Sequence, residues 1–504
     1  MAELGLGDGT SIPTGIDTRQ TYVNVSNPRP DSSSRIDAEL VNDLLASTIA
    51  LQTDLYRTRV VDARTYTTFT EAVAAAANKT LLLCSSVTLD ANTTIPDTVS
   101  LLVTRPGVIN ANGFTLTING SVVGNPMHQW LSGFNPGDIV FGAGSVDHVN
   151  ILWTGANPYN NNSVDSATAI NVAIRAARGN GQNAGNIYSP RGIYYLYDDI
   201  LIEGYVNFYG AGRGTVFFQK QVSKSVIKML QAQYSNLHDF SIGSDALYTN
   251  GLRLIESHHN TFKHISCFGV DYNAYLLEGC LYNNFFNVGT TSVEIPGADT
   301  PIEYPTRALL MQIGPIPAEY PCNKNLFMGC SFNAARGECI NLSYAKVNTF
   351  IGCTTEGIVD TPLVTLYGVY IDNATNLQNI FIGHYFEDGT YVTADLYDNG
   401  NRTLWLGAYG VDPSPAYQWE GSGYSGGNKA YWGLSPDELK FQEDTSLKRT
   451  AANALGLASG DALDLQTNSN TVTLKSGANQ SAAGAGVGEL WVDTSAGSVI
   501  KRGV

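Results

Sequence analysis

Short apolar segments separated by glycine, asparagine and proline make up most of this 504-residue chain. Between residues 58 and 148, several segments of four to six residues lie between such turn residues, which is typical of β-strands. Their spacing is too short for strand–helix–strand units. A short helix is predicted near Thr68, because Thr68 and Glu71 have capping-box spacing. The pattern therefore predicts a β-rich chain.

One strand pattern recurs through the middle of the chain, with an asparagine shortly before an aromatic or apolar residue. It appears as NLHDFSIG, HNTFKHIS, NNFFNVG, KNLFMGC, VNTFIGC, QNIFIGH and RTLWLG. The asparagines aligned in this way are Asn236, Asn260, Asn284, Asn325, Asn348 and Asn379. Their steps of roughly 20 to 40 residues, with short strands and turns, indicate a solenoid whose coils bury their apolar faces against one another.

The repeated positions have clear physical roles in such a solenoid. We expect each Phe to face the interior and stack on the Phe of the next coil, and each Asn to bond neighbouring coils through its amide. Gly329, Gly352 and Gly383 follow the Phe by two residues, where a sharp corner suits glycine. A leucine-rich horseshoe would need a Leu-x-x-Leu-x-Leu run in each repeat, which is missing. The pattern therefore favours an all-β parallel β-helix.

Both ends of the chain differ from this middle part. Residues 34–57 predict a helix with apolar residues in heptad register, which packs either on its own domain or on copies of itself. The domains that we predict are 1–57 (arm and helix), 58–148 (β-rich module leading into the solenoid), 149–412 (β-helix body), 413–450 (Gly/Tyr-rich connector) and 451–504 (C-terminal β-rich region).

Composition and charge exclude several classes of function. The formal net charge of -16, without a basic stripe, argues against nucleic acid as a partner. The seven cysteines form no CxxC pair, so we expect buried, reduced thiols and folding in a reducing cytoplasm. Neither a signal peptide nor an apolar run long enough for membrane insertion is present in the sequence. Motifs for metal, dinucleotide or other cofactors are also missing, so none is predicted.

The stretch from Thr154 to Gln219 resembles the start of a known family. It contains Gly155-Ala156, then Asp165, a helical Ala169-Ile170 step, the strand entry 190–194 (PRGIY) and the turn 210–213 (GAGR). In this order these features resemble the pectate-lyase-like right-handed parallel β-helix of bacteriophage tailspikes and polysaccharide lyases. The chain departs from the family at the first turn, where Asn160 to Asn162 and a single Asp165 replace the usual aspartates. The end of the chain, GELWVDTSAGSVIKRGV, resembles the hairpin that closes many tail-fibre chains.

This resemblance implies a function and its partners. A tailspike is a homotrimer that attaches to baseplate or portal-proximal tail proteins through its N-terminus, and that binds and usually cleaves host surface polysaccharide such as O-antigen or capsule. The resemblance implies a virion tail protein made in the host cytoplasm and acting at the host cell surface. Two alternatives stay open from the residues: a receptor-binding tail protein without catalysis, and a polysaccharide lyase acting by β-elimination.

Two acidic positions stand out against the repeat. Glu356 and Glu387 each follow the Phe of their coil by six residues, whereas the preceding coil has Asn333 at this offset. If the two coils are adjacent and in register, these carboxylates are close neighbours, as glycosidic hydrolysis by an acid and a base or nucleophile requires. They reach solvent only if the Gly corner breaks the strand. Asp388 would then be a third member of the catalytic group.

Further residues are candidates for contact with a sugar. We expect Tyr385 and Tyr367 to stack on pyranose rings, and His384, Asn333 and Arg336 to bind substrate. His384 has an alternative role as a structural histidine in the column of Cys330 and Cys353. Acids on or near the long loops are expected to be surface charges; they are Glu294, Glu303, Glu319, Glu338 and Asp360.

Overall fold

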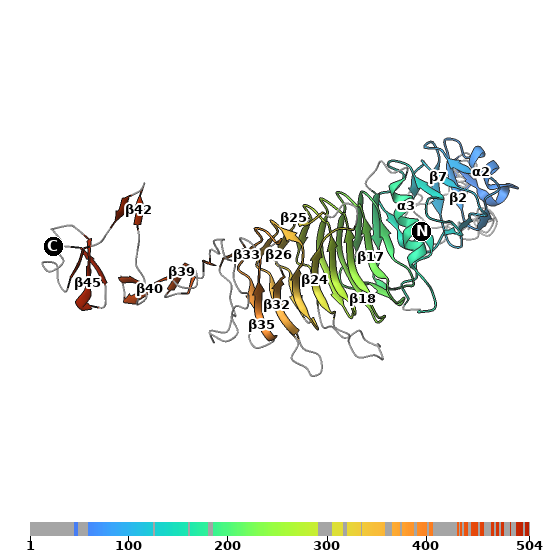
Figure 1. The fold of residues 1–504 in the computed structure, drawn as a ribbon. Helices are drawn as coiled ribbons and strands as arrows, with labels where there is room; N and C mark the ends of the chain where they lie inside the picture. Colours follow the sequence, from blue (N-terminus) through green and yellow to red (C-terminus); the bar gives the residue numbers. More distant parts are fainter. Residues whose placement is uncertain are drawn as a thin grey trace, which may run out of the picture. The chain divides into compact units, whose positions relative to one another are not determined.

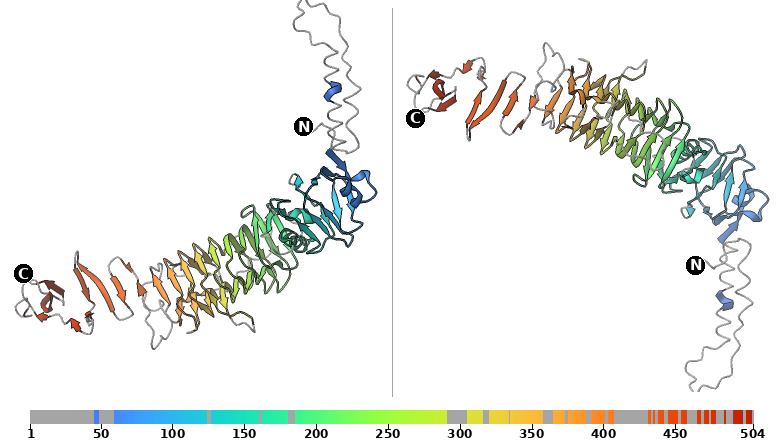
Figure 2. Two further views of the ribbon diagram at one scale, coloured as in Figure 1. Left: turned by 90° about the horizontal axis from the view of Figure 1, so that it is seen from above. Right: turned by 90° about the horizontal axis from the view of Figure 1, so that it is seen from below.

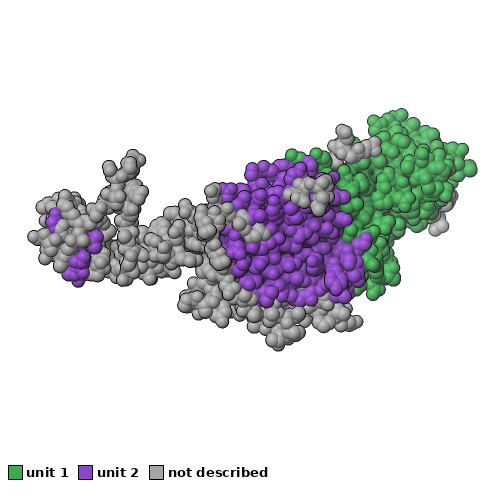
Figure 3. All heavy atoms as spheres, in the orientation of Figure 1, with its two compact units in different colours: residues 1–221, 234–240 green, residues 222–233, 241–504 purple. Residues whose placement is uncertain are grey.

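The computed structural model of the chain describes residues 45–48, 59–123, 127–159, 162–179, 185–290, 305–315, 320–333, 335–357, 365–372, 375–387, 391–400, 403–406, 431–432, 434–435, 438–441, 445–451, 454–457, 465–467, 470–472, 475–477, 484, 490–496 and 499–502. Residues 45–48 are helical, and the rest of the predicted N-terminal helix lies outside the described residues. The chain divides into two compact units, residues 1–221 with 234–240 and residues 222–233 with 241–504 (Figure 3).

Beside the helical residues 45–48, the described part of the first unit consists of short strands and the helices α2, α3, η2 and η3. Its elements are β1 (Val60–Asp62), η2 (Ala63–Thr65), α2 (Phe69–Ala75), β2 (Thr80–Leu83), β3 (Ser86–Thr88), β4 (Thr93–Ile95), β5 (Ser100–Val103), β6 (Val108–Asn110), β7 (Leu116–Ile118), β8 (Val122–Val123), β9 (Leu131–Ser132), β10 (Ile139–Phe141), β11 (Val149–Asn150), η3 (Ile151–Thr154), α3 (Ala167–Arg178), β12 (Gly185–Ser189), β13 (Gly192–Leu196), β14 (Ile200–Ile202), β15 (Val206–Gly210), β16 (Thr215–Gln219) and the first residues of β18 (Asn236–Ser244).

Strands β1 to β10 belong to successive coils of a parallel solenoid. They form three parallel sheets in the orders β1-β2-β5-β8, β3-β6-β9 and β4-β7-β10. The inward side chains of successive coils stack in register, such as Leu81 on Leu101, and both are fully buried. The expected helix near Thr68 is α2, and Thr68 and Glu71 form its capping box. Residues 59–148 thus already have the architecture that the sequence predicted for the later body.

The second unit contains the aligned repeats from Asn260 onward. Its elements are β17 (Ser225–Leu230), the end of β18, β19 (Asn250–Ile255), β20 (Thr261–Phe268), β21 (Asn273–Glu278), β22 (Asn284–Phe286), β23 (Gly289–Thr290), β24 (Arg307–Gln312), β25 (Cys322–Asn323), β26 (Leu326–Met328), β27 (Ser331–Asn333), β28 (Glu338–Leu342), β29 (Ala345–Lys346), β30 (Thr349–Ile351), β31 (Thr354–Glu356), β32 (Thr365–Ile371), β33 (Ile380–Ile382), β34 (Tyr385–Phe386), β35 (Tyr391–Asp398), β36 (Leu404–Leu406), β37 (Tyr431–Trp432), β38 (Leu434–Ser435), β39 (Glu438–Phe441), β40 (Thr445–Ala451), β41 (Ala454–Leu457), β42 (Leu465–Thr467), β43 (Asn470–Val472), β44 (Lys475–Gly477), β45 (Leu490–Asp493), η4 (Thr494–Ala496) and β46 (Val499–Arg502).

Coils of this unit stack as a parallel β-helix, so the predicted all-β fold is confirmed. One wall is the run of parallel pairs β17-β19-β21-β24-β28-β32-β35 (Figure 1). A second wall is the run β20-β22-β26-β30-β33-β36, and the two views in Figure 2 show the same stacking of strands along the chain. Near the C-terminus, β45 and β46 pair antiparallel, in agreement with the expected terminal hairpin.

The aromatic residues of the repeat form one interior column. Phe262, Phe285, Phe327, Phe350 and Phe381 are fully buried. Successive rings are nearly parallel, with centroids 4.5 to 4.6 Å apart, and Trp405 stacks on Phe381 at 3.9 Å. This spacing matches the separation of neighbouring β-strands, about 4.8 Å. The expected stack of inward Phe residues is therefore confirmed.

A buried ladder of asparagines runs beside the aromatic column. Its members are Asn260, Asn283, Asn325, Asn348 and Asn379. In each of the last four, Oδ1 accepts both the backbone N–H and the side-chain amide N–H of the ladder asparagine before it, at 2.9 to 3.0 Å. Each side-chain amide also donates to a backbone carbonyl, such as that of Asn283 to Ser257. The amides thus hydrogen-bond one coil to the next inside the protein.

The sequence alignment was wrong at two of these positions. Asn236 and Asn284 lie one residue after the ladder position, on the outward side of their strands, where both are only half-buried. The ladder position is occupied instead by Ser235, which is almost fully buried, and by Asn283. At Asn284 the error arose because two successive asparagines, Asn283 and Asn284, fit the repeat equally well. At Asn236 it arose because the interior position of this coil is Leu237, which pairs with the interior Phe208, and not Phe240.

Left-handed backbone residues form the corners of each coil. The residue before every ladder asparagine has a positive φ, from 54° to 58° for His259, Tyr282, Lys324, Val347 and Gln378. Non-glycine residues rarely adopt this conformation, especially a β-branched one such as Val347. The ladder hydrogen bonds stabilise these corners, since they bind the residue that directly follows each one.

The predicted glycine corners are also present. Gly329, Gly352 and Gly383 have φ values of 63°, 57° and 61°, in the region that glycine enters without steric cost. All seven cysteines are buried and none is in a disulfide. Burial raises the pKa of the Cys339 thiol to about 12, so this thiol stays protonated and unreactive at neutral pH.

Replacing a ladder asparagine is expected to destabilise the β-helix. Asn325→Ala leaves the N–H groups of Asn283 without their acceptor, and each buried group that loses its partner costs about 1–3 kcal/mol. We expect a lower melting temperature in calorimetry or circular dichroism. The matched control is Asn284→Ala, whose side chain faces outward and should change the melting temperature little. Equal losses in both variants would contradict the role of the ladder.

Candidate active site on the outer face of the β-helix

The predicted acids lie on short strands that follow the glycine corners. Strand β31 begins after Gly352, and its side chains alternate so that Thr355 faces the interior while Thr354 and Glu356 face outward. The left-handed turn at Gly352 resets the alternation that would otherwise point Glu356 inward, six residues after the buried Phe350. Glu356 is exposed as a result. The corner is therefore what brings this acid to the surface.

Glu356 and Glu387 lie opposite each other on neighbouring coils. Strands β31 and β34 are parallel and in register, with Thr354 opposite Tyr385 and Thr355 opposite Phe386. The backbone N–H of Glu387 continues this ladder by donating to the carbonyl of Thr355 at 3.0 Å. Their backbones are thus separated by one strand spacing, about 4.8 Å. The register on which the acid-pair hypothesis depended is present.

Asn333 extends the acidic row by one coil. It lies opposite Glu356 in the pairing of β27 with β31, and its side-chain amide donates to Glu356 Oε2 at 3.2 Å. A parallel row of hydroxyls runs beside it, since Thr354 Oγ1 donates to Ser331 Oγ at 3.0 Å. Tyr385, which is 40% exposed, completes this second row. The predicted residues Asn333, Glu356, Tyr385 and Glu387 therefore share one outer face, which we call the acid face.

His384 is not part of this face, so its predicted contact with substrate is wrong. Its side chain is fully buried and packs against the rings of Phe386 and Trp405. Nε2 lies 3.3 Å from Thr355 Oγ1, and Nδ1 has no hydrogen-bond partner among the described residues. Burial lowers the pKa of His384 to about 3, so the ring is neutral at physiological pH. The alternative reading as a structural histidine in the cysteine column fits these contacts.

Arg336 and Tyr367 have other contacts in the same unit. The guanidinium of Arg336 forms an ion pair with Asp271 and donates to its carbonyl at 2.6 Å. The ring of Tyr367 lies against those of Tyr370 and Tyr397, with centroids 5.1 and 5.7 Å away. Their roles in substrate binding stay predictions without support from these contacts.

Several candidates lie outside the described residues. They are Asp388, Glu294, Glu303, Glu319 and Asp360. Glu338 is described and pairs with Arg307, whose Nε donates to Glu338 Oε2 at 2.9 Å. Across the part of the chain that the structure describes, no three or more His, Cys, Asp or Glu residues are grouped as metal ligands. No helix in that part is long and apolar enough to cross a membrane.

Sequence reasoning missed the hydroxyl row beside the acids. Ser331 and Thr354 carry no motif, and they become neighbours only through the strand register. The signal that could have found them is the offset from the glycine corner, because both follow Gly329 and Gly352 by two residues. The same offset selects Tyr385, which the sequence did single out by its aromatic ring.

These features define the chain as a parallel β-helix protein with an acidic row on its outer face. No protein-family model matches the chain, and neither does any curated protein. Solved structures do. ORF18 of Geobacillus virus E2 matches with TM-score 0.40 and 14% identity, over 71% of this chain and 86% of that one.

Two further structures illustrate the range of proteins with this fold. The gp42 tailspike of Acinetobacter phage vb_AbaP_AS12 matches with TM-score 0.40 and 14% identity, over 55% of this chain and 49% of that one. The A-module of mannuronan C-5 epimerase AlgE6 from Azotobacter vinelandii matches with TM-score 0.29 and 15% identity, over 55% of this chain and 98% of that one. All three are less than 25% identical to this chain, and its parallel β-helix is established by its own strand pairing.

His384 should make stability depend on pH. The folded state keeps the ring neutral down to about pH 3, whereas the unfolded chain binds a proton below about pH 6.5. Between these values the unfolded state holds the extra proton, so the free energy of unfolding falls as pH falls, by up to about 1.4 kcal/mol per pH unit. Denaturant titrations of His384→Leu between pH 4 and 6 should show a shallower slope. The exposed His264 supplies the control His264→Gln, and an unchanged slope in His384→Leu would contradict the assignment.

Proposed function

We propose that the chain is a bacteriophage tailspike that binds host surface polysaccharide and hydrolyses it as an endo-glycosidase through Glu356 and Glu387. The observation that carries the proposal is the in-register placement of two outward carboxylates on adjacent coils of a parallel β-helix. Tyr385, with a partly exposed ring, and Asn333, with its amide on Glu356, flank the pair. A flat face of this kind suits a long polymer that lies across several coils.

The chemistry assigns different tasks to the two acids. Hydrolysis of a glycosidic bond uses one carboxylic acid to protonate the leaving oxygen and one carboxylate as base or nucleophile. Glu356 accepts the amide hydrogen bond of Asn333, which holds its carboxylate in one orientation, so we assign it the nucleophile role. Glu387 is then the acid. Neighbouring strand positions favour the short carboxyl separation of retaining enzymes, about 5–5.5 Å, and Asp388 is proposed as an assisting acid.

Binding without catalysis is the second candidate. Glu356 is exposed on a sheet face rather than enclosed, so water has access to the carboxylate that would attack the sugar. A receptor-binding spike needs only the polar and aromatic groups of the acid face. A lyase has less support, since the guanidiniums of Arg336 and Arg307, the candidate bases, are paired with Asp271 and Glu338.

A homotrimer is proposed because one outer face of the β-helix is apolar. The outward side chains of β26, β30, β33 and β36 carry no charge; they are Leu326, Met328, Thr349, Ile351, Ile380, Ile382, Leu404 and Leu406. Met328 and Ile382 are 40% and 36% exposed. We call this set the apolar face. Contiguous apolar surface of this kind marks interaction sites, and a second copy would present rows with the same strand spacing.

Other parts of the proposed function lie on residues that the structure does not describe. Attachment to baseplate or portal-proximal tail proteins is assigned to residues 1–57. The predicted location is the virion tail, after synthesis in the host cytoplasm. The sugar composition of the polysaccharide follows from neither the sequence nor the acid face.

Removing either carboxylate should abolish cleavage but leave binding. In Glu356→Gln and Glu387→Gln, we expect release of reducing ends from host surface polysaccharide to fall at least about 100-fold, the range for loss of a general acid or base. Proton NMR of the first product should show retention of the anomeric configuration.

The control for the two acid variants is Glu256→Gln. Glu256 lies at another corner, where its carboxylate accepts a hydrogen bond from Gln231. This variant should cleave like the parent chain. Cleavage that persists in both acid variants would disprove their role, and a parent chain that binds polymer without cleaving it would favour the binding-only candidate.

Charges on the apolar face should prevent assembly. The parent chain should elute with a light-scattering mass of about three times its 54.1 kDa. The double variant Met328→Glu with Ile382→Glu should shift toward the single-chain mass, because burying unpaired carboxylates is costly. Leu247, which is 49% exposed elsewhere in this unit, supplies the control Leu247→Glu. A double variant that keeps the full mass would place the interface on another surface.

A further inference from the structure

A second polar and aromatic surface lies in the first unit, on the outer face of three parallel strands. Strands β12 and β15 pair in register, which places Asn186 beside Asn207 and Tyr188 beside Tyr209. The start of β18 adds a third coil, with Asn236 beside Asn207 and His238 beside Tyr209. The residues between them, such as Ile187 and Phe208, face the interior. Two outward rows therefore run side by side, one of amides and one of rings.

The amide row is a hydrogen-bonded chain. Asn236 donates to Oδ1 of Asn207 at 2.9 Å, and Asn207 donates to Oδ1 of Asn186 at 3.2 Å. Asn186 in turn donates to the carbonyl of Asp147 at 3.0 Å. Each amide nitrogen carries a second hydrogen that the row itself does not use. The row therefore offers fixed amide donors toward a ligand.

The ring row lies two residues further along the same strands. Tyr188 and Tyr209 have centroids 5.4 Å apart, and Tyr209 stacks on His238 at 5.4 Å. The ring of His148 meets that of Tyr188 edge-on at 5.3 Å and stacks on Trp153 at 6.5 Å. Both tyrosine hydroxyls are without hydrogen-bond partners in the part of the chain that the structure describes. The rings are thus held in place while their polar edges stay available.

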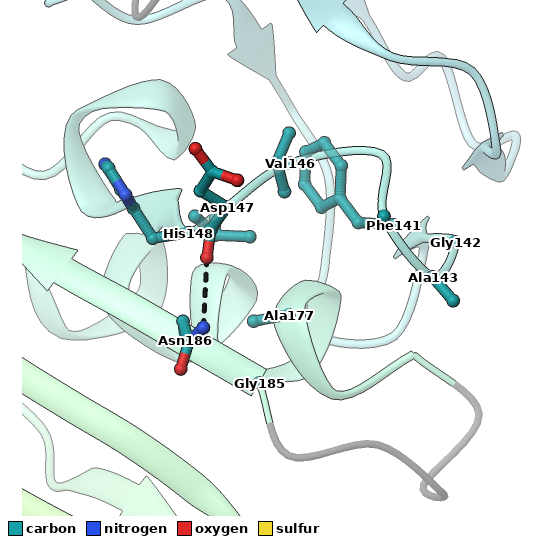
Figure 4. A pocket seen from close by; sticks show the side chains of 11 residues that line it. Phe141, Gly142, Ala143, Val146, Asp147, His148, Ala177, Gly185 and Asn186 are labelled. Carbon is teal, nitrogen blue, oxygen red and sulfur yellow. Dashed lines mark hydrogen bonds between the residues drawn. The ribbon is translucent and has the colours of Figure 1, made fainter.

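A cavity of about 260 Å³ adjoins the amide row. Asp147, His148 and Asn186 line one side of it, and the segment from Phe141 to Ala143 lines the other (Figure 4). Its volume is close to the lower end of small-ligand sites, about 300 Å³. The carboxylate of Asp147 is exposed at this cavity, and it supplies an acceptor that the amides lack.

We propose that this surface, the amide platform, is a separate glycan-binding site for a neutral polysaccharide. Asn186, Asn207, Asn236, Tyr188 and Tyr209 would hydrogen-bond its hydroxyls, and the cavity beside Asp147 would hold one sugar ring or branch. Amide groups and ring edges recognise hydroxyls, and the strand spacing of about 4.8 Å is similar to the length of one pyranose unit. The inference rests on the proposed function for the class of ligand, but it does not need cleavage.

The charges around the platform select against acidic sugars. Asp147 is exposed, and Asp239 beside His238 is 40% exposed. In the ring row, Nδ1 of His238 lies 2.7 Å from Asp239 Oδ2, and burial lowers the pKa of the neighbouring His148. A uronic acid or a phosphorylated sugar would therefore meet the carboxylates of Asp147 and Asp239 at this surface. An apolar subunit surface is also a poor fit, because the amide row and Asp147 would lose their hydration on burial.

Hydrogen–deuterium exchange of the full-length chain tests the platform. The Glu356→Gln variant, which should bind without cleaving, is mixed with a panel of neutral bacterial O-antigen and capsule polysaccharides, and with alginate as an acidic probe. A neutral polymer should slow exchange in peptides covering 141–149, 185–189 and 206–210, and alginate should not. Peptides covering 350–357 and 380–387 report the acid face in the same experiment, so failure of either site is seen independently.

Two variants make the assignment specific. Asn186→Ala removes the exposed end of the amide row, and Tyr188→Phe removes one hydroxyl but keeps the ring that contacts His148. Combined, they should weaken binding of the intact neutral polymer at least tenfold and remove the slowed exchange at 185–189. Cleavage of short oligosaccharides at the acid face should stay unchanged, and Asn284→Ala is the matched amide control.

Three results would overturn the proposal. One is that no polymer of the panel slows exchange at the platform. Another is that alginate protects it as well as a neutral polymer does. The third is that exchange at the platform is already slow in the chain alone and does not change when polymer is added. That result would assign the surface to contact with a second copy of the chain.

Discussion

The buried asparagine ladder is the interaction on which the second unit depends. Every coil must turn sharply next to this ladder, and it does so with a residue such as Tyr282 or Lys324 in left-handed conformation. That turn exposes backbone groups to an apolar interior, where unpaired donors are costly. The amides of Asn283 and Asn325 pair them with the neighbouring coil. The ladder therefore fixes the register of each coil on the next, because a shift by one residue would leave all of these groups unpaired.

The register between coils in turn determines which outward side chains lie beside one another. Stacking Phe350 on Phe381 forces the positions that follow the glycine corners to align as well, and this puts Glu387 opposite Glu356. The same rule sets Asn207 between Asn186 and Asn236 in the first unit. Rows of like side chains are therefore the natural functional element of this fold. A row supplies repeated contacts to a repeating polymer without needing a deep cleft.

Much of this architecture was predictable from the sequence, because the interior residues repeat. The Phe column, the glycine corners and the pairing of Glu356 with Glu387 follow from spacing alone. Sequence reasoning failed at Asn284, because Asn283 and Asn284 fit the repeat equally well. It also failed for His384, because the sequence does not show that this side chain is buried. It also did not find the amide platform. Asn186 and Asn207 are 21 residues apart and occur in segments without the Phe motif, so only the strand pairing reveals that they are neighbours.

The left-handed corners have a consequence for which positions of the β-helix tolerate substitution. The residues at these positions differ widely in chemistry, from His259 and Tyr282 to Lys324, Val347 and Gln378, although their φ values agree within a few degrees. The asparagine that follows specifies the backbone, so the corner side chain has little influence on folding. Substitutions along this edge alter surface chemistry without disturbing the interior. Such an edge can therefore carry different surface groups while the buried asparagines and aromatic rings keep the coils in register.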